Sequence, residues 1–315
     1  MFDTERFIEE NIEELKNKIE GKALIAFSGG VDSTVCAALV NKAIGKQLIA
    51  VNVDTGFMRK NEPKEIKKTM EKMGLNYRFI DASEEYLKAL KGVKDPEKKR
   101  KIIGEKFIRI FEKVAKEENI EYLIQGTIAP DWIESGDELR DTIKSHHNVG
   151  GLPEKMDLKI IEPLRDLYKD EVRKLARKLD LNVSERQPFP GPGLAIRILG
   201  KMTSERVEII KEACHIVEQE IQKAVEKKQM EKPWQYFAVL IPVKSVGVQG
   251  DKRAYGNVIA IRSVESIDAM TSSFSQIPFD ILDKISTRIT NILGHKINRV
   301  VYDVTNKPPG TIEWE

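Results

Sequence analysis

The chain has 315 residues, of which 41% are hydrophobic and 32% are charged, so it is long enough for two domains with sizeable cores. Its formal net charge of +2 gives no general reason to expect binding to nucleic acid or to a membrane surface. Two cysteines cannot form a disulfide framework, and no apolar run reaches the roughly 20 residues that span a bilayer. The acidic, amphipathic N-terminus is unlike a signal peptide. We therefore expect a cytoplasmic protein.

The first half of the chain shows alternating strand and helix patterns. Apolar residues at helical spacing predict an opening helix over 7–19, a long helix starting at Asp95-Pro96 and another helix over 169–179. Buried strands are predicted at these ranges: 23–27, 47–53, 76–80, 121–125 and 158–161. This alternation indicates an α/β domain with a parallel sheet covered on both faces. The polar, aperiodic segment 130–157 is typical of a lid or a disordered loop.

The second half begins after a stretch rich in proline and glycine. Arg186–Gly193 (RQPFPGPG) is typical of a domain boundary, so we predict one domain over 1–187 and a second over 188–315. The second region is predicted to contain two helices and three strands: helices at 207–225 and 278–293, and strands at 236–241, 257–261 and 300–304. This is a thin α+β layer, which predicts that exposed apolar strand faces pack against a second copy.

The stretch Ala23–Thr34 (ALIAFSGGVDST) predicts a buried strand that runs into a Gly-Gly turn and then a helix. Gly29 and Gly30 let the backbone bend sharply and approach a ligand. Successive N–H groups at a helix N-terminus form a concave anion site, and Ser28, Ser33 and Thr34 add hydroxyl donors at its rim. The turn contains no lysine, so it is not a Walker A loop. Phosphate charge must then be met by Mg²⁺ and by basic residues from elsewhere.

The string SGGVDS resembles the pyrophosphate-binding loop of the ATP pyrophosphatases. Seven further segments and the C-terminal end together resemble GMP synthase, in the archaeal-like form whose synthetase is a separate subunit. These segments are DTGFMRKNE (54–62), KRKIIGEKF (99–107), QGT (125–127), IKSHHNVGGLPE (143–154), EPLRDLYKDEVR (162–173), RQPFPGPGLAIR (186–197), SVGVQGD (245–251) and KPPGTIEWE (307–315). The resemblance implies an adenine-nucleotide α-hydrolase-like ATP pyrophosphatase domain followed by a smaller α+β dimerisation domain.

This resemblance implies the synthesis of GMP from XMP, ATP and ammonia. The C2 oxygen of XMP attacks the α-phosphorus of ATP, pyrophosphate leaves, and ammonia then displaces AMP. Such chemistry depends on positioning and on neutralising charge. Asp32 is the candidate Mg²⁺ ligand because a hard cation prefers carboxylate oxygen. The alternative is that Asp32 caps the following helix.

The resemblance also implies individual contacts. For ATP and pyrophosphate they are Ser28, Gly29, Gly30, Val31, Asp32, Ser33, Thr34, Val53, Arg59 and Gly126. For XMP they are Arg100, Gln249, Lys307, Thr311, Ile312 and Glu313. Lys307 would meet the 5′-phosphate and Glu313 the purine edge, with Gln249 close by. In the lid, Lys144, His146 and His147 would contact the leaving pyrophosphate as catalytic residues, a better interpretation of the two histidines than a zinc site.

Without the resemblance, three of these features have ordinary explanations. Arg59 would be a solvated arginine at a helix start, and Arg100 part of a solvated basic helix face. The last nine residues would be a Pro-rich tail with a frayed end.

The sequence contains no recognisable glutaminase nucleophile. Such a cysteine sits on a sharp elbow flanked by glycines, whereas Cys36 lies in the helix after the loop and Cys214 lies on the apolar stripe of another helix. The Gly-Gly loop begins at residue 28, so we expect no such domain before it. We expect a separate glutaminase subunit to deliver ammonia, and we expect a homodimer.

Two other functions remain open from the residues. One is another adenylating enzyme with a different acceptor, either related to NAD synthetase or modifying tRNA. A tRNA enzyme would predict a basic face, cysteine pairs or an added RNA-binding module, and none stands out. The other is a non-catalytic subunit that binds ATP or AMP, which would have no need of an intact pyrophosphate loop with Asp32.

Overall fold

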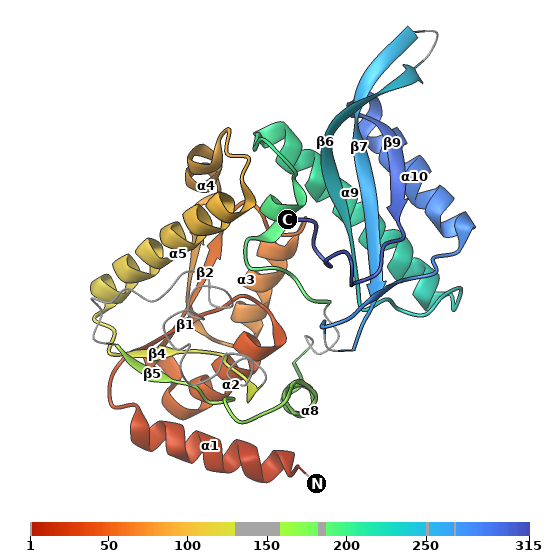
Figure 1. Cartoon of the computed structure of the whole chain (residues 1–315). Coiled ribbons are helices and arrows are strands. Elements are labelled where there is room, and N and C mark those ends of the chain that lie inside the picture. Colours follow the sequence, from red (N-terminus) through yellow and green to blue (C-terminus); the bar gives the residue numbers. More distant parts are fainter. Residues whose placement is uncertain (1, 130–157, 182–186, 250–251, 268) are drawn as a thin grey trace. The chain divides into compact units, whose positions relative to one another are not determined.

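The computed structural model describes residues 2–129, 158–181, 187–249, 252–267 and 269–315. The chain forms two compact units (Figure 1). The first unit comprises residues 1–55, 61–82 and 103–186, and the second comprises 56–60, 83–102 and 187–315. The second unit therefore takes two short segments from the N-terminal half of the chain. The predicted lid, with Lys144, His146 and His147, lies outside the described residues.

The first unit is built on a five-stranded sheet in which all strands are parallel. Its order is β3-β2-β1-β4-β5, and its strands are β1 (Ala23–Ala26), β2 (Leu48–Asp54), β3 (Asn76–Asp81), β4 (Tyr122–Ile124) and β5 (Lys159–Ile161). The central strands β1, β2 and β4 are almost entirely buried, as expected for strands covered on both faces. The predicted α/β fold with a parallel sheet is confirmed.

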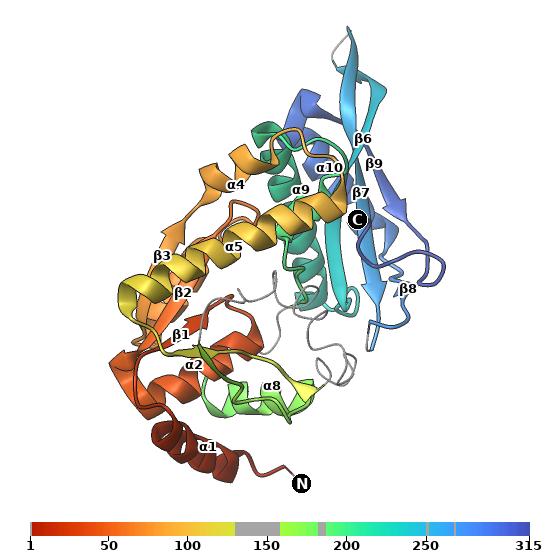
Figure 2. The ribbon, with the colours of Figure 1, turned by 60° about the vertical axis from the view of Figure 1, so that its left-hand side comes forward.

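One helix of this unit precedes β1, and the others come after strands along the chain. They are α1 (Thr4–Lys18), α2 (Val31–Ile44), α3 (Glu62–Lys72), α5 (Pro96–Glu118) and α8 (Lys169–Lys178). α1, α2 and α8 pack against one another (Figure 2), and α3 packs on β2 and β3. α5 begins among the residues of the second unit and continues into the first from Ile103. Because α2 follows β1 directly, its N-terminus lies at the carboxyl edge of the sheet.

In the second unit, long antiparallel strands pack with helices. β6 (Gln235–Gln249) and β7 (Lys252–Glu265) form a hairpin, β9 (Ile297–Asp303) pairs with β7 in parallel, and β8 (Ser273–Phe274) adds a short antiparallel pair. Helix α9 (Ser204–Glu226) packs on β6 and on α10 (Phe279–Leu293). Both hairpin strands are longer than predicted, so the hairpin extends as an arm (Figure 1).

The smaller elements complete the two units. Helix α4 (Ser83–Leu90) in the second unit was not predicted. In the described part of the chain, 3₁₀ turns occur at Gly45–Gln47, Gly193–Arg197 and Gly294–Lys296. No helix of the described residues is both long and apolar enough to cross a membrane.

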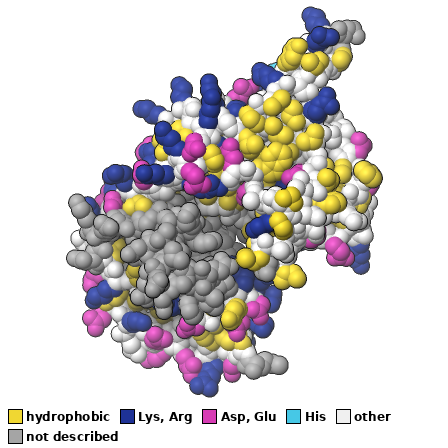
Figure 3. Space-filling model, in the orientation of Figure 1, with side chains coloured by type: hydrophobic (Ala, Val, Ile, Leu, Met, Phe, Trp, Pro, Cys, Tyr) yellow, Lys and Arg dark blue, Asp and Glu magenta, His cyan; other side chains and the backbone are white. Residues whose placement is uncertain are grey.

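Apolar side chains remain exposed on the sheet of the second unit. Figure 3 shows a broad apolar patch on this unit, and the exposed large residues of its strands are Val243, Val246, Val248, Tyr255 and Val301. Val248 is 78% exposed and Tyr255 is 60% exposed. A patch of this kind is typical of a protein interface.

Candidate functional site

The phosphate loop, residues 28–34, turns from β1 into the N-terminus of α2. Gly29 has a φ of +73°, a left-handed conformation that favours glycine. Gly30 is the N-cap residue of α2 and no side chain caps it. Its own N–H donates to Ser28 Oγ at 3.3 Å. A helix N-terminus that no side chain caps is the arrangement that binds anions.

Hydroxyl groups hold this turn together. Ser33 Oγ lies 3.0 Å from Ser28 Oγ and donates to the Gly30 carbonyl at 3.2 Å. Thr34 Oγ1 donates to the same carbonyl at 2.7 Å, and its side chain is fully buried. Thr34 therefore stabilises the loop from its buried side, while Ser28 is exposed to solvent.

Asp32 stands in the first turn of α2 and does not cap the helix. Its Oδ2 accepts a hydrogen bond from Lys169 Nζ, on α8, at 2.5 Å. Its Oδ1 is buried and makes no hydrogen bond within the described residues. A buried carboxylate oxygen without a partner is unfavourable unless a ligand satisfies it. Asp32 therefore fits the predicted role of metal ligand, and Lys169 is a basic residue at this loop that the sequence analysis did not single out.

Magnesium would need further ligands besides Asp32. No group of three or more acidic, histidine or cysteine side chains suited to a metal occurs in the described part of the chain. Mg²⁺ commonly binds through one or two carboxylates together with substrate phosphates and water. The donor set at Asp32 thus suits a metal that arrives with a nucleotide rather than a closed protein cage.

The loop lies where the strand order of the sheet reverses. β2 and β3 extend the sheet to one side of β1, and β4 and β5 extend it to the other. Open α/β sheets bind ligands at this switch point, outside the carboxyl ends of the strands. Gly126 follows β4 here, and a Cβ built on it would lie 3.4 Å from Asp32 Cβ. Val53, predicted at the adenine pocket, is buried near the end of β2.

Arg59 belongs to the second unit. Its Nε pairs with Glu218 Oε1 at 2.9 Å, and its guanidinium stacks 4.1 Å from the ring centroid of Phe189. The side chain is only 15% exposed, so the alternative of a solvated arginine is wrong. The phosphate contact implied by the resemblance stays a prediction.

The C-terminal tail, Lys307–Glu315, is tied down along its length. Buried Arg262 donates to the carbonyl oxygens of Thr311 at 3.1 Å and Ile312 at 3.4 Å. The Lys307 ammonium donates to the Ala269 carbonyl at 2.8 Å. Trp314 Nε1 donates to Asp303 Oδ2 at 2.9 Å. The alternative of a frayed tail is therefore wrong.

Two buried cations hold the acidic residues of the tail. Arg197 Nη2 lies 2.7 Å from Glu313 Oε1, and Arg197 Nε lies 3.1 Å from Glu313 Oε2. Lys99 Nζ lies 2.5 Å from Glu315 Oε2. Burial disfavours the charge on Arg197, but the Glu313 carboxylate holds the pKa of Arg197 above its ordinary value. Burial lowers the pKa of Lys99, although Glu315 opposes this.

All six predicted XMP residues lie in this same unit. Arg100 is on the first turns of α5, where it pairs with Glu97 and is 33% exposed. It is therefore only partly solvated, and its ion pair is with Glu97 rather than with a residue of the tail. Gln249 is the last residue of β6. Thr311 Oγ1 donates to the Glu313 carbonyl. Arg100 and the tail thus share one unit, and their predicted contacts with XMP stay predictions.

Neither cysteine is suited to nucleophilic chemistry. Burial, reinforced by Asp32 and Glu162, raises the pKa of the Cys36 thiol well above its usual range. Burial raises the pKa of the Cys214 thiol to about 11. A thiol is reactive only as the thiolate, so both side chains are inert members of the core at neutral pH.

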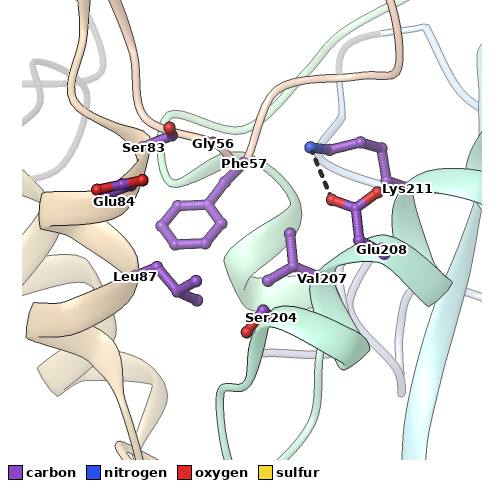
Figure 4. A pocket seen from close by; sticks show the side chains of 9 residues that line it. All are labelled: Gly56, Phe57, Ser83, Glu84, Leu87, Ser204, Val207, Glu208 and Lys211. Atoms are coloured by element: carbon purple, nitrogen blue, oxygen red, sulfur yellow. Dashed lines mark hydrogen bonds and ion pairs between the residues drawn. The ribbon is translucent and has the colours of Figure 1, made fainter.

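A cavity of about 190 Å³ lies within the second unit, between α4, the start of α9 and the turn at Gly56-Phe57 (Figure 4). Its walls are apolar at Phe57 and Val207, and Glu208 pairs with Lys211 at 3.5 Å beside it. None of the predicted site residues lines this cavity, so it is separate from the candidate site.

Comparison with known proteins identifies the family. The family model of the GMP synthase C-terminal domain matches residues 219–314, and the model of the queuosine biosynthesis protein QueC matches residues 22–187. The chain is 57% identical over 319 residues to a subunit of the glutamine-hydrolyzing GMP synthase of Methanopyrus kandleri, with 100% of both sequences covered. The chain belongs to this family of GMP synthase subunits.

Further similarities extend to another relative and to a solved structure. The corresponding GMP synthase subunit of Thermococcus kodakarensis is 58% identical, with 99% of each sequence covered. Among solved structures, the NMN synthetase of Francisella tularensis aligns with a TM-score of 0.47 at 19% identity, covering 73% of this chain and 89% of that chain. The full-length similarity to the GMP synthase subunits continues beyond residue 187, where the QueC match ends.

Proposed function

We propose that this chain is the synthetase subunit of a two-subunit GMP synthase, which makes GMP from XMP, ATP and ammonia. The observation that carries this proposal is the phosphate loop with Asp32 in a chain similar over its full length to subunits of glutamine-hydrolyzing GMP synthase. A tRNA-modifying activity or a passive nucleotide-binding role has no comparable support, because neither accounts for the second unit with its anchored tail.

The first unit would bind the triphosphate of ATP. The uncapped N-terminus of α2 and the exposed Ser28 hydroxyl would hold the leaving pyrophosphate. Lys169 would add positive charge beside Asp32. These groups are fixed before the reaction, so they can stabilise charge that develops as the bond to the α-phosphorus breaks.

Asp32 would hold Mg²⁺ through its unpaired Oδ1. When bound, this ion neutralises phosphate charge that a loop without its own lysine cannot meet. The second unit would bind XMP through Lys307 at the 5′-phosphate and Glu313 at the purine edge. Arg100 and Gln249 would add contacts.

We further propose a separate glutaminase subunit as the source of ammonia and a homodimer as the assembled state. Inert, buried thiols at Cys36 and Cys214 support the first proposal, because glutamine hydrolysis needs a reactive nucleophile. The exposed apolar side chains of β6, β7 and β9 support the second. Light scattering at micromolar concentration should give twice the chain mass of 35.9 kDa, and a mass of one chain would contradict the dimer.

The purified chain tests the function directly. Incubated with XMP, ATP, Mg²⁺ and ammonium, it should form GMP, AMP and pyrophosphate in equal amounts. Activity at fixed total ammonium should rise with pH, because free ammonia is the nucleophile. With glutamine in place of ammonium it should form neither GMP nor glutamate.

Two outcomes would contradict this proposal. Failure to release pyrophosphate when XMP is present would remove XMP as the acceptor. Glutamine-dependent GMP formation that survives Cys36→Ser and Cys214→Ser would remove the need for a second subunit.

A further inference from the structure

Arg197 is a buried arginine at the end of the Gly193–Arg197 turn. Its side chain is only 1% exposed. The guanidinium carbon lies 3.9 Å from the ring centroid of Phe237 and 5.1 Å from that of Phe189. Contact with two aromatic rings in a buried site restricts the orientation of the guanidinium. A restricted guanidinium also restricts the directions in which its N–H groups point.

These N–H groups point at the carboxylate of Glu313. Nε and Nη2 of Arg197 donate to the two different oxygens of Glu313, at 3.1 and 2.7 Å. Gln235 Nε2 donates to Oε1 at 3.3 Å. A carboxylate has about four acceptor positions, so these three donors leave one. The Glu313 side chain is still 18% exposed, and the remaining position is therefore available to a ligand.

The path of the tail backbone has its own anchors. Arg262 holds the main-chain carbonyls of Thr311 and Ile312, and Lys99 holds the side chain of Glu315. The tail is therefore fastened on both sides of Glu313 without Arg197. What Arg197 adds is the orientation of one carboxylate.

We propose that Arg197 is a positioning residue for the nucleobase, which holds the Glu313 carboxylate so that its remaining acceptor position meets an N–H of xanthine. This rests on the proposed function, in which Glu313 contacts the purine edge. Arg197 itself does not touch XMP. It acts through Glu313, and a lysine cannot replace it because an ammonium neither stacks flat on Phe237 nor forms the two parallel bonds.

The test uses Arg197→Lys in the full chain with ammonium as the nitrogen source. We expect the KM for XMP to rise about 10-fold or more, as for loss of an oriented charge-assisted contact, while the KM for ATP stays within about twofold. A general loosening of the protein would raise both constants.

A double-mutant cycle with Glu313→Gln separates positioning from simple stability. If Arg197 acts through Glu313, then Arg197→Lys should raise the KM for XMP much less in a Glu313→Gln background than in the wild type. A purely structural arginine would give the same factor in both backgrounds.

The matched control is Arg206→Lys. Arg206 is another arginine of this unit, and it donates to the carbonyls of Leu199 and Lys201 and not to Glu313. The Arg206→Lys variant should have a lower thermal stability and an unchanged KM for XMP. If Arg197→Lys does not fold, Gln235→Met removes a weaker donor to the same carboxylate and should raise the KM for XMP about 2- to 5-fold, again dependent on Glu313.

The outcomes keep the inference distinct from the proposed function. If the wild type makes no GMP, the proposed function fails, whatever the variants do. If the wild type is active but Arg197→Lys leaves the KM for XMP unchanged, the inference is wrong and the function stands. Equal effects on XMP and ATP, additive effects with Glu313→Gln, or an unaltered KM in Glu313→Gln itself would also overturn it.

Discussion

The phosphate loop and the C-terminal tail present binding groups in opposite ways. The loop is made from seven consecutive residues, 28–34, and is held by its own hydroxyl groups and by the start of α2. The tail is held by side chains distant in sequence. Arg262 lies 50 residues from Ile312, Arg197 lies 116 residues from Glu313, and Lys99 lies 216 residues from Glu315.

This difference determines how each region responds to change. A locally closed turn keeps its shape as long as its strand and helix form. A tail held by buried cations depends on the whole second unit, because each cation needs its partner in place to offset the loss of hydration. We therefore expect substitutions in the loop to change chemistry without changing stability, and substitutions of the tail anchors to change both.

The largest expected effect is at the loop. Asp32→Asn should slow XMP-dependent pyrophosphate release by roughly 10²-fold or more, as for removal of a preorganised charged group in a phosphoryl-transfer site. Thermal stability should change by less than about 1 kcal/mol, because Oδ1 has no protein partner to lose among the described residues and the ion pair of Oδ2 with Lys169 is partly exposed. The measurement is coupled pyrophosphate release with saturating XMP, together with a melting curve.

The control for this variant is Asp170→Asn, since Asp170 also lies in the first turn of a helix but pairs with Lys174 on the surface. It should leave the rate unchanged. A normal rate in Asp32→Asn would remove its metal-binding role.

The next effect is at the tail. Arg262→Lys should lower the free energy of unfolding by about 1–3 kcal/mol, the usual range for leaving buried acceptors without donors. Arg262 is fully buried and donates hydrogen bonds to the carbonyls of Thr305, Thr311 and Ile312. A lysine ammonium lacks the planar, spread donors of a guanidinium and cannot reach all three carbonyls. Denaturant unfolding measures the change.

Arg253→Lys provides the comparison, because Arg253 is an exposed arginine on the same strand. It should leave stability within about 0.5 kcal/mol, as for most surface changes. Equal stability of the two variants would mean that the tail does not depend on distant anchors.

The same contrast explains how much the sequence could predict. The strands of the first unit and the phosphate loop follow from local periodicity and turn residues, and these were predicted correctly. Helix α4 was missed although Ser83 begins it, and the hairpin strands were predicted too short. Residues at the hairpin end, including Lys252 and Arg253, are exposed on both faces of the strand. They therefore lack the alternation of apolar and polar residues from which a strand is predicted.

The tail anchors could not be predicted. Arg197 and Lys99 lie inside segments that resemble the family, but nothing local distinguishes a buried arginine or lysine from a solvated one. Lys99 sits in the run KKRK, which is typical of an exposed helix face, yet its side chain is fully buried. A buried charge needs partners, here Glu315 and the Ile198 carbonyl at 2.6 Å, and both come from parts of the chain that are distant in sequence.

The smallest expected effect is the pH dependence that Lys99 gives to stability. Burial lowers the pKa of Lys99 in the folded state below its ordinary value of 10.5, with Glu315 opposing the shift. Between the lowered pKa and 10.5 the unfolded chain binds more protons than the folded one, so the free energy of unfolding rises with pH in this window. Below the lowered pKa both states carry the proton, and the contribution is constant and at its least favourable.

Lys99→Met removes this titration. The stability of the wild type relative to Lys99→Met should therefore increase as the pH rises from neutrality toward 10.5. Urea unfolding across this range measures the difference, with Lys98→Met, an exposed neighbour, as the control that should show no trend. A difference that stays constant with pH would mean that the folded and unfolded states bind this proton equally. The ion pair with Glu315 would then fully compensate for burial, so that the charged ammonium of Lys99 is as stable in the folded protein as it is in water.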